Sequence, residues 1–157
     1  MQDSILPNLV DGLEIVRPEQ VWVSDITYIR LGNGFVYLAV ILDVFTRSIH
    51  GWSLGRTVET SLTLAALRLA LTACLPEIHH SDQGIQYAAK DYTDLLNEYH
   101  VQISMAAQGK PEENDFVERL IRTIKEEEVD LTDFNDFANA RAQIGRFLED
   151  VYMRSIM

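Results

Sequence analysis

The chain has 157 residues, which is enough for one domain with a core of its own. Its apolar content of 47% and charged content of 24% are those of an ordinary globular protein, and the longest apolar run, residues 35–42, is too short to cross a bilayer. The net charge of −11 argues against a free-standing nucleic-acid binder: either carboxylates are gathered to bind metal and a basic region is supplied elsewhere, or the protein never touches nucleic acid.

The N-terminal residues 1–18 are expected to form an arm that packs on the edge of the domain. Asp11-Gly12 and Pro18 interrupt any long element there. Residues 19–157 are expected to form a single domain, because no repeat, low-complexity tract or boundary interrupts them.

The cysteine content and the first residues indicate a reducing compartment. A single cysteine, Cys74, excludes an internal disulfide. The first ten residues carry Gln2, Asp3 and Pro7 instead of the basic start and apolar run of a secretory signal. We therefore expect a cytoplasmic protein.

The first half of the chain predicts three antiparallel strands. β-Branched and aromatic residues predict a strand over 21–29, and the Asn33-Gly34 pair predicts a hairpin turn after it. Residues 35–45 and 48–55 predict the second and third strands. The near-continuous apolarity of 35–45 indicates burial on both faces, and hence a central position in the sheet.

Two of these strands contain an acid. Asp25 lies in the middle of the first, where burial is costly unless the carboxylate is paired or holds a metal. A hydrogen bond to a turn or a salt bridge is the competing explanation. Asp43, near the end of the second strand, is a rival for a metal site, but Arg47 is close enough in sequence to pair with it, so we expect Asp43 to be structural.

The second half of the chain predicts helices that alternate with strands. Residues 59–75 are expected to form a helix with Thr60 or Ser61 as its cap and Pro76 as its end. The later elements are a strand over 78–82, a helix over 88–99, a strand over 101–105 and a last helix over 138–153.

Asp82 lies at the C-terminal end of the strand predicted over 78–82. That strand follows a crossover helix, so we expect it to run parallel to the first strand. Ligands gather at this end of the strands in open α/β sheets. His79 and His80 point to opposite faces of such a strand, so at most one can face a site; structural or substrate-contact roles are favoured over ligation, because Mg²⁺ prefers oxygen.

Residues 108–128 predict a Gly-Lys-Pro turn followed by a helix. Apolar residues at helical spacing mark its core stripe: Phe116, Val117, Leu120, Ile121 and Ile124. At about 100° per residue, Asn114, Glu118 and Lys125 lie within about 40° of one another and away from the centre of that stripe. This helix face therefore offers an amide, an acid and an ammonium to a group outside the core.

The predicted element order, β-β-β-α-β-α-β-α-α, describes an α/β fold: a mixed five-stranded sheet, with three antiparallel strands and then parallel ones, flanked by helices. We expect Asp25, Asp82 and Glu118 to meet in one cleft. Three carboxylates suit one or two hard divalent ions such as Mg²⁺. Two such ions would activate the attacking oxygen and stabilise the leaving oxygen in chemistry on a phosphodiester.

Four stretches in order along the chain, VWVSDITYI, AVILDVFTR, HHSDQGIQY and SMAAQGKPEENDFVERLIRTIKEEEV, closely resemble the catalytic core of bacterial insertion-sequence transposases, which are related to retroviral integrases. Thirty-five residues separate Asp82 from Glu118, a spacing typical of this Asp-Asp-Glu family. The resemblance runs from about Asn8 to Tyr152. It implies a ribonuclease H-like fold, with Asp25, Asp82 and Glu118 as a catalytic triad that binds one or two Mg²⁺ or Mn²⁺ ions.

The activity implied by this resemblance is hydrolytic nicking at element ends, followed by attack of the freed 3′-hydroxyl on target DNA. It also implies that Lys110, Asn114 and Lys125 contact phosphates and position the substrate. Each could instead be a surface residue, and Lys125 has Glu128 at helical spacing for an ion pair. The partners implied are DNA, both element ends and target, and further copies of the chain, in the bacterial cytoplasm and without a membrane.

Two departures from the family pattern bear on the function. The family carries a basic helix-turn-helix region upstream and a tail after the position of Tyr152, whereas this sequence starts at the core and stops at Met157. We therefore expect a truncated copy of the transposase that lacks its DNA-binding domain. Two alternatives stay open: a catalytically incompetent remnant that acts as a binding or inhibitory partner of intact transposase, and a stand-alone ribonuclease H-like nuclease.

Overall fold

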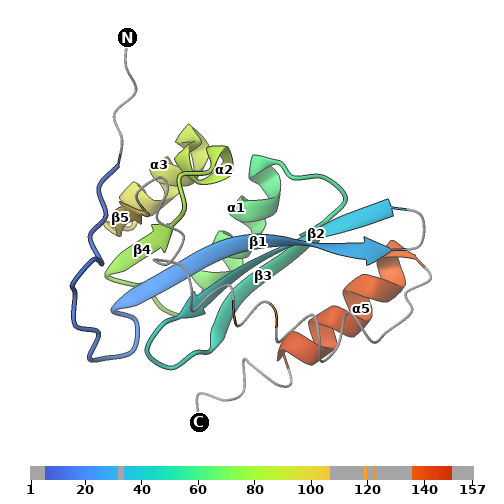
Figure 1. Cartoon of the computed structure of the whole chain (residues 1–157), viewed down its shortest axis with the longest axis horizontal. Coiled ribbons are helices and arrows are strands. Elements are labelled where there is room, and N and C mark those ends of the chain that lie inside the picture. The colour runs from blue at the N-terminus through green and yellow to red at the C-terminus, as the bar shows by residue number, and fades with distance from the viewer. Residues whose placement is uncertain (1–5, 32–33, 107–118, 120–121, 123–135, 150–157) are drawn as a thin grey trace.

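The computed structural model describes residues 6–31, 34–106, 119, 122 and 136–149 (Figure 1). Its strands are β1 (Val21–Leu31), β2 (Gly34–Asp43), β3 (Ile49–Gly55), β4 (Ile78–Ser81) and β5 (Gln102–Met105). The described helices are α1 (Thr60–Ala70), α2 (Ile85–Ala88), α3 (Lys90–Glu98) and α5 (Phe137–Phe147).

The five strands form one mixed sheet in the order β3-β2-β1-β4-β5. β1 pairs antiparallel with β2, and β2 antiparallel with β3, whereas β4 runs parallel to β1 and β5 runs parallel to β4. Leu31 pairs with Gly34 across the predicted hairpin. The predicted mixed sheet is confirmed, with β1 in its middle and β2 as an interior strand.

Helices cover both faces of this sheet (Figure 1). On one face, α1 and α3 pack with the even-numbered side of β1, where Trp22 is completely buried. On the other face, α5 packs with the odd-numbered side of β1, which includes Val21, Val23 and Ile29. Because side chains alternate along a strand, Asp25 belongs to the odd-numbered side. The first four residues of the central strand are thus buried, and residues 25–27, which follow, are half-buried.

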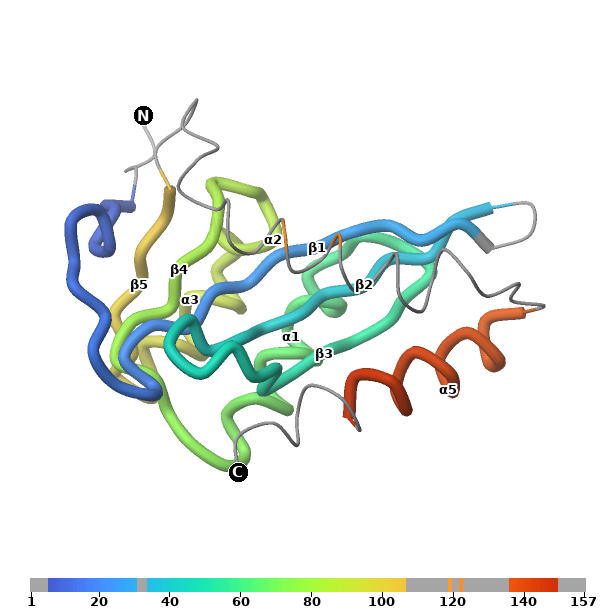
Figure 2. The backbone as a smooth tube through the Cα atoms, turned by 60° about the horizontal axis from the view of Figure 1, so that its bottom comes forward, coloured from blue at the N-terminus to red at the C-terminus, as the bar shows by residue number. Residues whose placement is uncertain are grey.

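The described part of the N-terminal arm, residues 6–18, runs beside the edge strand β5 (Figure 2). The Met105 N–H donates to the Pro7 carbonyl oxygen at 2.9 Å, and the Leu9 N–H donates to Ser104 Oγ at 2.7 Å. The arm covers backbone groups that an open edge strand would otherwise present to another chain.

Helix α1 is shorter than the predicted helix over 59–75. It ends at Ala70, and the chain turns before Pro76 is reached. The capping residue is Glu59, which makes no side-chain capping bond, so the prediction of Thr60 or Ser61 as the cap is wrong.

The helix predicted over 88–99 is α3, which begins two residues later and ends one residue earlier, and the short helix α2 precedes it. Ala89 is extended, with φ −61° and ψ 142°, and separates α2 from α3. Helix α5 begins where Asp136 accepts a hydrogen bond from the Asn139 N–H at 2.8 Å; its predicted end at Met153 lies outside the described residues.

Within the described part of the chain, no helix has the length and apolarity that a membrane span needs.

Candidate metal centre

Asp25 and Asp82 come from neighbouring parallel strands. Asp25 lies in the middle of β1, and Asp82 directly follows β4. The two strands pair in constant register up to Val23 and His80, and the same offset carried two residues further places Asp25 beside Asp82. At this point β4 ends while β1 continues into the hairpin. The two carboxylates therefore lie where the parallel part of the sheet opens, the usual position of ligands in α/β folds.

The charges of Asp25 and Asp82 both act on Tyr87 of α2. Its side chain is buried, and burial raises the pKa of its phenol well above the usual value; Tyr92 and the negative charges of Asp25 and Asp82 raise it further. Both carboxylates therefore act electrostatically on one buried group. Sequence analysis did not single out Tyr87, because an aromatic residue on a helix is usually part of the core. The feature that could have identified it as a neighbour of the site is its position five residues after Asp82.

The turn that carries Asp82 is tied to the end of β5. Gly84 donates its N–H to Asp82 Oδ1 at 2.7 Å, and Gln83 Nε2 donates to the Ala106 carbonyl oxygen at 3.0 Å. The Ala106 N–H in turn donates to the Ser81 carbonyl oxygen at 2.8 Å. Ala106, the last described residue before 107–118, therefore lies beside the turn that carries Asp82.

Replacing Gly84 with Ala is expected to weaken Mn²⁺ binding by about tenfold with little change in stability. An added Cβ would lie 2.8 Å from Asp82 Oδ1, so this exposed carboxylate must leave its position, at low cost because its side chain can rotate. Mn²⁺ titration calorimetry and urea unfolding measure the two effects. Gly34→Ala, whose Cβ would meet nothing within 4 Å, is the matched control; equal Mn²⁺ affinity in the two variants would show that Asp82 does not need its present orientation.

The donors at this site fit a hard divalent cation. Asp25 is half-buried and Asp82 is exposed, so both carboxylates can reach a hydrated ion. Carboxylate oxygens are the ligands that Mg²⁺ and Mn²⁺ prefer, and Mg²⁺ in proteins retains several waters. The open position of Asp82 leaves room for these waters and for a phosphate oxygen.

The remaining predicted site residues, Glu118, Lys110, Asn114 and Lys125, lie outside the described residues. Two described positions in the same segment, Arg119 and Arg122, are helical and exposed. Arg122 follows Glu118 by four residues, so on a continuous helix it shares the face predicted for Glu118 and Lys125. Sequence analysis missed this cation, although its spacing from Glu118 was visible.

Asp43 has the structural role that was predicted, but the hydrogen bonds described for its carboxylate come from residues other than Arg47. Its Oδ1 accepts from the N–H groups of Phe45 at 2.7 Å and Thr46 at 3.2 Å, and its Oδ2 accepts from the Glu19 N–H at 2.6 Å. Burial would raise the pKa of this carboxyl, but the nearby His50 ring and hydrogen bonds from these backbone groups hold it below its usual value. Asp43 therefore shapes the turn after β2 and the start of β1.

The two histidines of β4 point to opposite sides, as the strand predicts. His79 Nε2 lies 2.7 Å from both Ser24 Oγ and Tyr92 Oη, whereas His80 Nδ1 lies 2.8 Å from Ser104 Oγ. Both rings are buried among these hydroxyl partners. Burial lowers the pKa of His79 to about 3, so its ring is neutral in the folded protein.

The protein is expected to lose about 2 kcal/mol of stability between pH 7 and pH 5 because of His79 alone. The pKa of this ring is about 3 when folded, against an ordinary 6.5, so the unfolded chain binds the extra proton. The contribution of His79 to the free energy of unfolding is complete above pH 6.5 and falls as the pH drops towards 3. Urea unfolding at the two pH values, compared with His79→Gln, measures the effect; an identical pH dependence in both proteins would contradict it.

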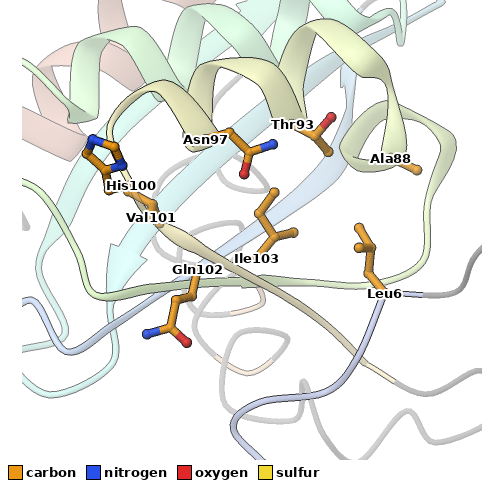
Figure 3. Close-up of a pocket in the computed structure, with 8 residues that line it drawn as sticks. All are labelled: Leu6, Ala88, Thr93, Asn97, His100, Val101, Gln102 and Ile103. Atoms are coloured by element: carbon orange, nitrogen blue, oxygen red, sulfur yellow. The ribbon is translucent and has the colours of Figure 1, made fainter.

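A separate surface pocket of about 940 Å³ lies between α3, β5 and the arm (Figure 3). Leu6, Thr93, Asn97 and Ile103 are among its lining residues. Of the predicted site residues that the structure describes, neither Asp25 nor Asp82 lines it.

Comparison with protein families agrees with the resemblance that the sequence shows. The model of the integrase core domain matches residues 16–111, and a second model with the same description matches residues 99–151. The transposase of insertion sequence IS904 from Lactococcus lactis is 35% identical over 153 residues, covering 93% of this chain and 59% of that protein. The transposase InsF of IS3A from Escherichia coli is 34% identical over 140 residues, covering 87% of this chain and 49% of that protein. The chain thus spans roughly half the length of these relatives.

Solved structures of retroviral integrases share the fold. The catalytic core of the HTLV-2 integrase, solved in complex with magnesium, has a TM-score of 0.61 at 18% identity and covers 89% of both chains. An integrase chain of the simian T-cell lymphotropic virus intasome has a TM-score of 0.66 at 17% identity, covering 95% of this chain and 54% of that one. These likenesses establish the ribonuclease H-like fold that the sequence predicted.

Proposed function

The chain belongs to the integrase core domain family, and from this premise we propose that it is the catalytic core of an insertion-sequence transposase that cuts and joins DNA strands. The observation that carries the proposal is the convergence of Asp25 and Asp82, which register and shared influence on Tyr87 both support. Glu118 is proposed as the third carboxylate, on the basis of its spacing from Asp82 and its position in the matched region.

The proposed reaction has two displacements at phosphorus. In the first, a water oxygen attacks the scissile phosphate, the P–O3′ bond breaks, and the element end is left with a 3′-hydroxyl. In the second, that hydroxyl loses its proton and attacks a target phosphate, so that a new P–O3′ bond forms and the target releases its own 3′-oxygen. One phosphodiester is exchanged for another in this step, so no external energy source is needed.

The carboxylates of Asp25, Asp82 and Glu118 are proposed to bind one or two Mg²⁺ or Mn²⁺ ions. Such ions, when bound, activate the attacking oxygen and stabilise the leaving oxygen. The protein contributes position: the buried start of β1 fixes the strand that carries Asp25, and the Gly84 N–H orients Asp82. The magnesium in the HTLV-2 integrase core supports this choice of metal.

DNA, as element ends and target, is the proposed substrate, and Lys110, Asn114 and Lys125 are proposed to hold its phosphates. Arg122 is added to this group because it is exposed and shares the predicted face of Glu118. These cations matter in a chain with a net charge of −11, because local positive charge must offset the general repulsion of DNA. Self-association of the chain on DNA is proposed by analogy with the integrase in an intasome.

The experiment is a strand-transfer assay with Mn²⁺ on a pre-cleaved oligonucleotide and on a branched oligonucleotide that mimics the joined product. The proposal predicts joined or resolved products that require the metal. The acidity of the chain favours one alternative, a core that retains the fold as an inhibitory partner of intact transposase. That alternative predicts no product from this chain and reduced product from intact transposase when the chain is added.

A further inference from the structure

A second group of metal-binding side chains lies at the start of β1, six residues before Asp25. Glu19, His50 and Cys74 offer a carboxylate oxygen, an imidazole nitrogen and a thiol sulfur that all lie within 4.8 Å of one another. The three residues come from separate segments: the turn two residues before β1, strand β3, and the loop between α1 and β4. All three are half-buried, so their convergence is part of the packed fold.

His50 is the strongest sign that this cluster is incomplete without a further atom. Its side chain is only 10% exposed, and Nε2 lies 3.1 Å from Glu19 Oε1 and 3.8 Å from Asp43 Oδ2. Despite these short distances, Nε2 is buried without a well-formed hydrogen bond to any described residue. A buried polar atom left in this state costs stability unless something else satisfies it.

Glu19 is held in place by its surroundings. Its backbone is in the left-handed region with φ 63°, an uncommon conformation for a residue other than glycine. Its N–H donates to Asp43 Oδ2 at 2.6 Å, and Trp22 Nε1 donates to its Oε1 at 2.7 Å. Hydrogen bonds from neighbouring groups to a ligand side chain, such as that from Trp22 to Glu19, orient the ligands of metal sites. Residues in uncommon backbone conformations are also frequent at functional sites.

We propose that Glu19, His50 and Cys74 bind a zinc ion, with water or Asp43 as a fourth ligand. A mixed set of oxygen, nitrogen and sulfur donors suits Zn²⁺, whereas Mg²⁺ and Ca²⁺ prefer oxygen alone. Ligand atoms around a tetrahedral zinc lie about 3.5 Å apart. The present separations, up to 4.8 Å, require only a small inward movement of the side chains.

Zinc binding at this site releases one proton. Zinc binds cysteine through its thiolate, so the thiol of Cys74 must lose its proton when the ion binds. The S–H bond breaks, an S–Zn bond forms, and the proton passes to solvent, so the step is balanced without any oxidant.

The zinc site is separate from the carboxylate site. Glu19 precedes β1, and the extended strand from Val21 to Asp25 alone spans about 13 Å. A zinc ion there would join the start of β1, strand β3 and the loop before β4. Because it binds only the folded protein, it stabilises this end of the sheet and leaves the chemistry at Asp25 unchanged.

The test is titration of the whole purified chain with Co²⁺, a coloured substitute for zinc. Because Cys74 is the only cysteine, a thiolate-to-cobalt absorption band can arise from no other residue. We expect the band in the wild type and in Asp25→Asn, its loss in Cys74→Ser, and about 100-fold weaker binding in His50→Gln. The matched control is His100→Asn, a change at an exposed histidine that should leave the band intact.

A second measurement does not depend on any variant. Zinc is expected to slow the reaction of Cys74 with a thiol-specific reagent by at least about tenfold in the wild type. The proposal is overturned if the folded wild type shows no thiolate-to-cobalt band, or if Zn²⁺ leaves the reactivity of Cys74 unchanged. Neither result would bear on strand transfer, which uses different residues.

Discussion

Asn in place of Asp25 is expected to reduce Mn²⁺-dependent strand transfer by about a thousandfold while the protein stays folded. A metal ligand contributes several kcal/mol to the stabilisation of the transition state, and each 1.36 kcal/mol is a factor of ten in rate. Asn keeps the shape of Asp and removes its charge, so the half-buried position in β1 is still filled. Asp82→Asn and Glu118→Gln are expected to have effects of similar size, because the three carboxylates act on the same ions.

The control for these variants is Asp94→Asn. Asp94 is an exposed aspartate of α3 whose carboxylate pairs with Lys90 at 2.7 Å. Asp94→Asn is the same chemical change as Asp25→Asn, at a residue with no proposed part in the reaction. Circular dichroism and urea unfolding should show that all the variants are folded. Activity in Asp25→Asn equal to that of Asp94→Asn would remove Asp25 from the mechanism.

Ala in place of Gly51 is expected to destabilise the fold by about 3 kcal/mol or to prevent folding altogether. Gly51 lies in β3 directly under α1. A Cβ there would be 2.2 Å from the Ala66 carbonyl oxygen and 2.9 Å from Ala70 Cβ. The first of these atoms belongs to the helix backbone and cannot move alone, so the helix must lift off the sheet and expose apolar surface.

Urea unfolding of Gly51→Ala and Gly34→Ala tests this packing. Both changes add one methyl group to a strand of the same sheet, but at Gly34 the new Cβ meets nothing within 4 Å. Similar stabilities for the two variants would mean that α1 does not pack on β3 as closely as the structure shows.

Much of the fold follows from sequence patterns. The alternation in residues 21–29 and the Asn33-Gly34 pair predicted the antiparallel hairpin, and the crossover rule predicted that β4 runs parallel to β1. That rule is also why Asp25 and Asp82 could be expected to lie together. These features depend on local periodicity and on chain direction, both of which a sequence displays.

The errors arose where the ends of helices had to be placed. Helix α1 ends at Ala70, before Pro76 is reached, and the short helix α2 was not predicted. The cluster of Glu19, His50 and Cys74 was not predicted at all, because its members come from three segments and form no motif. Tertiary packing alone brings them together.

The central claim is that Asp25, Asp82 and Glu118 gather around a divalent ion, and anomalous diffraction from crystals grown with Mn²⁺ tests it most directly. The account predicts a manganese peak between Asp25 and Asp82, with a carboxylate oxygen of Glu118 at about 2.2 Å or linked to the ion through one water. A well-ordered Glu118 that points away from the two aspartates, with no peak between them, would contradict the account.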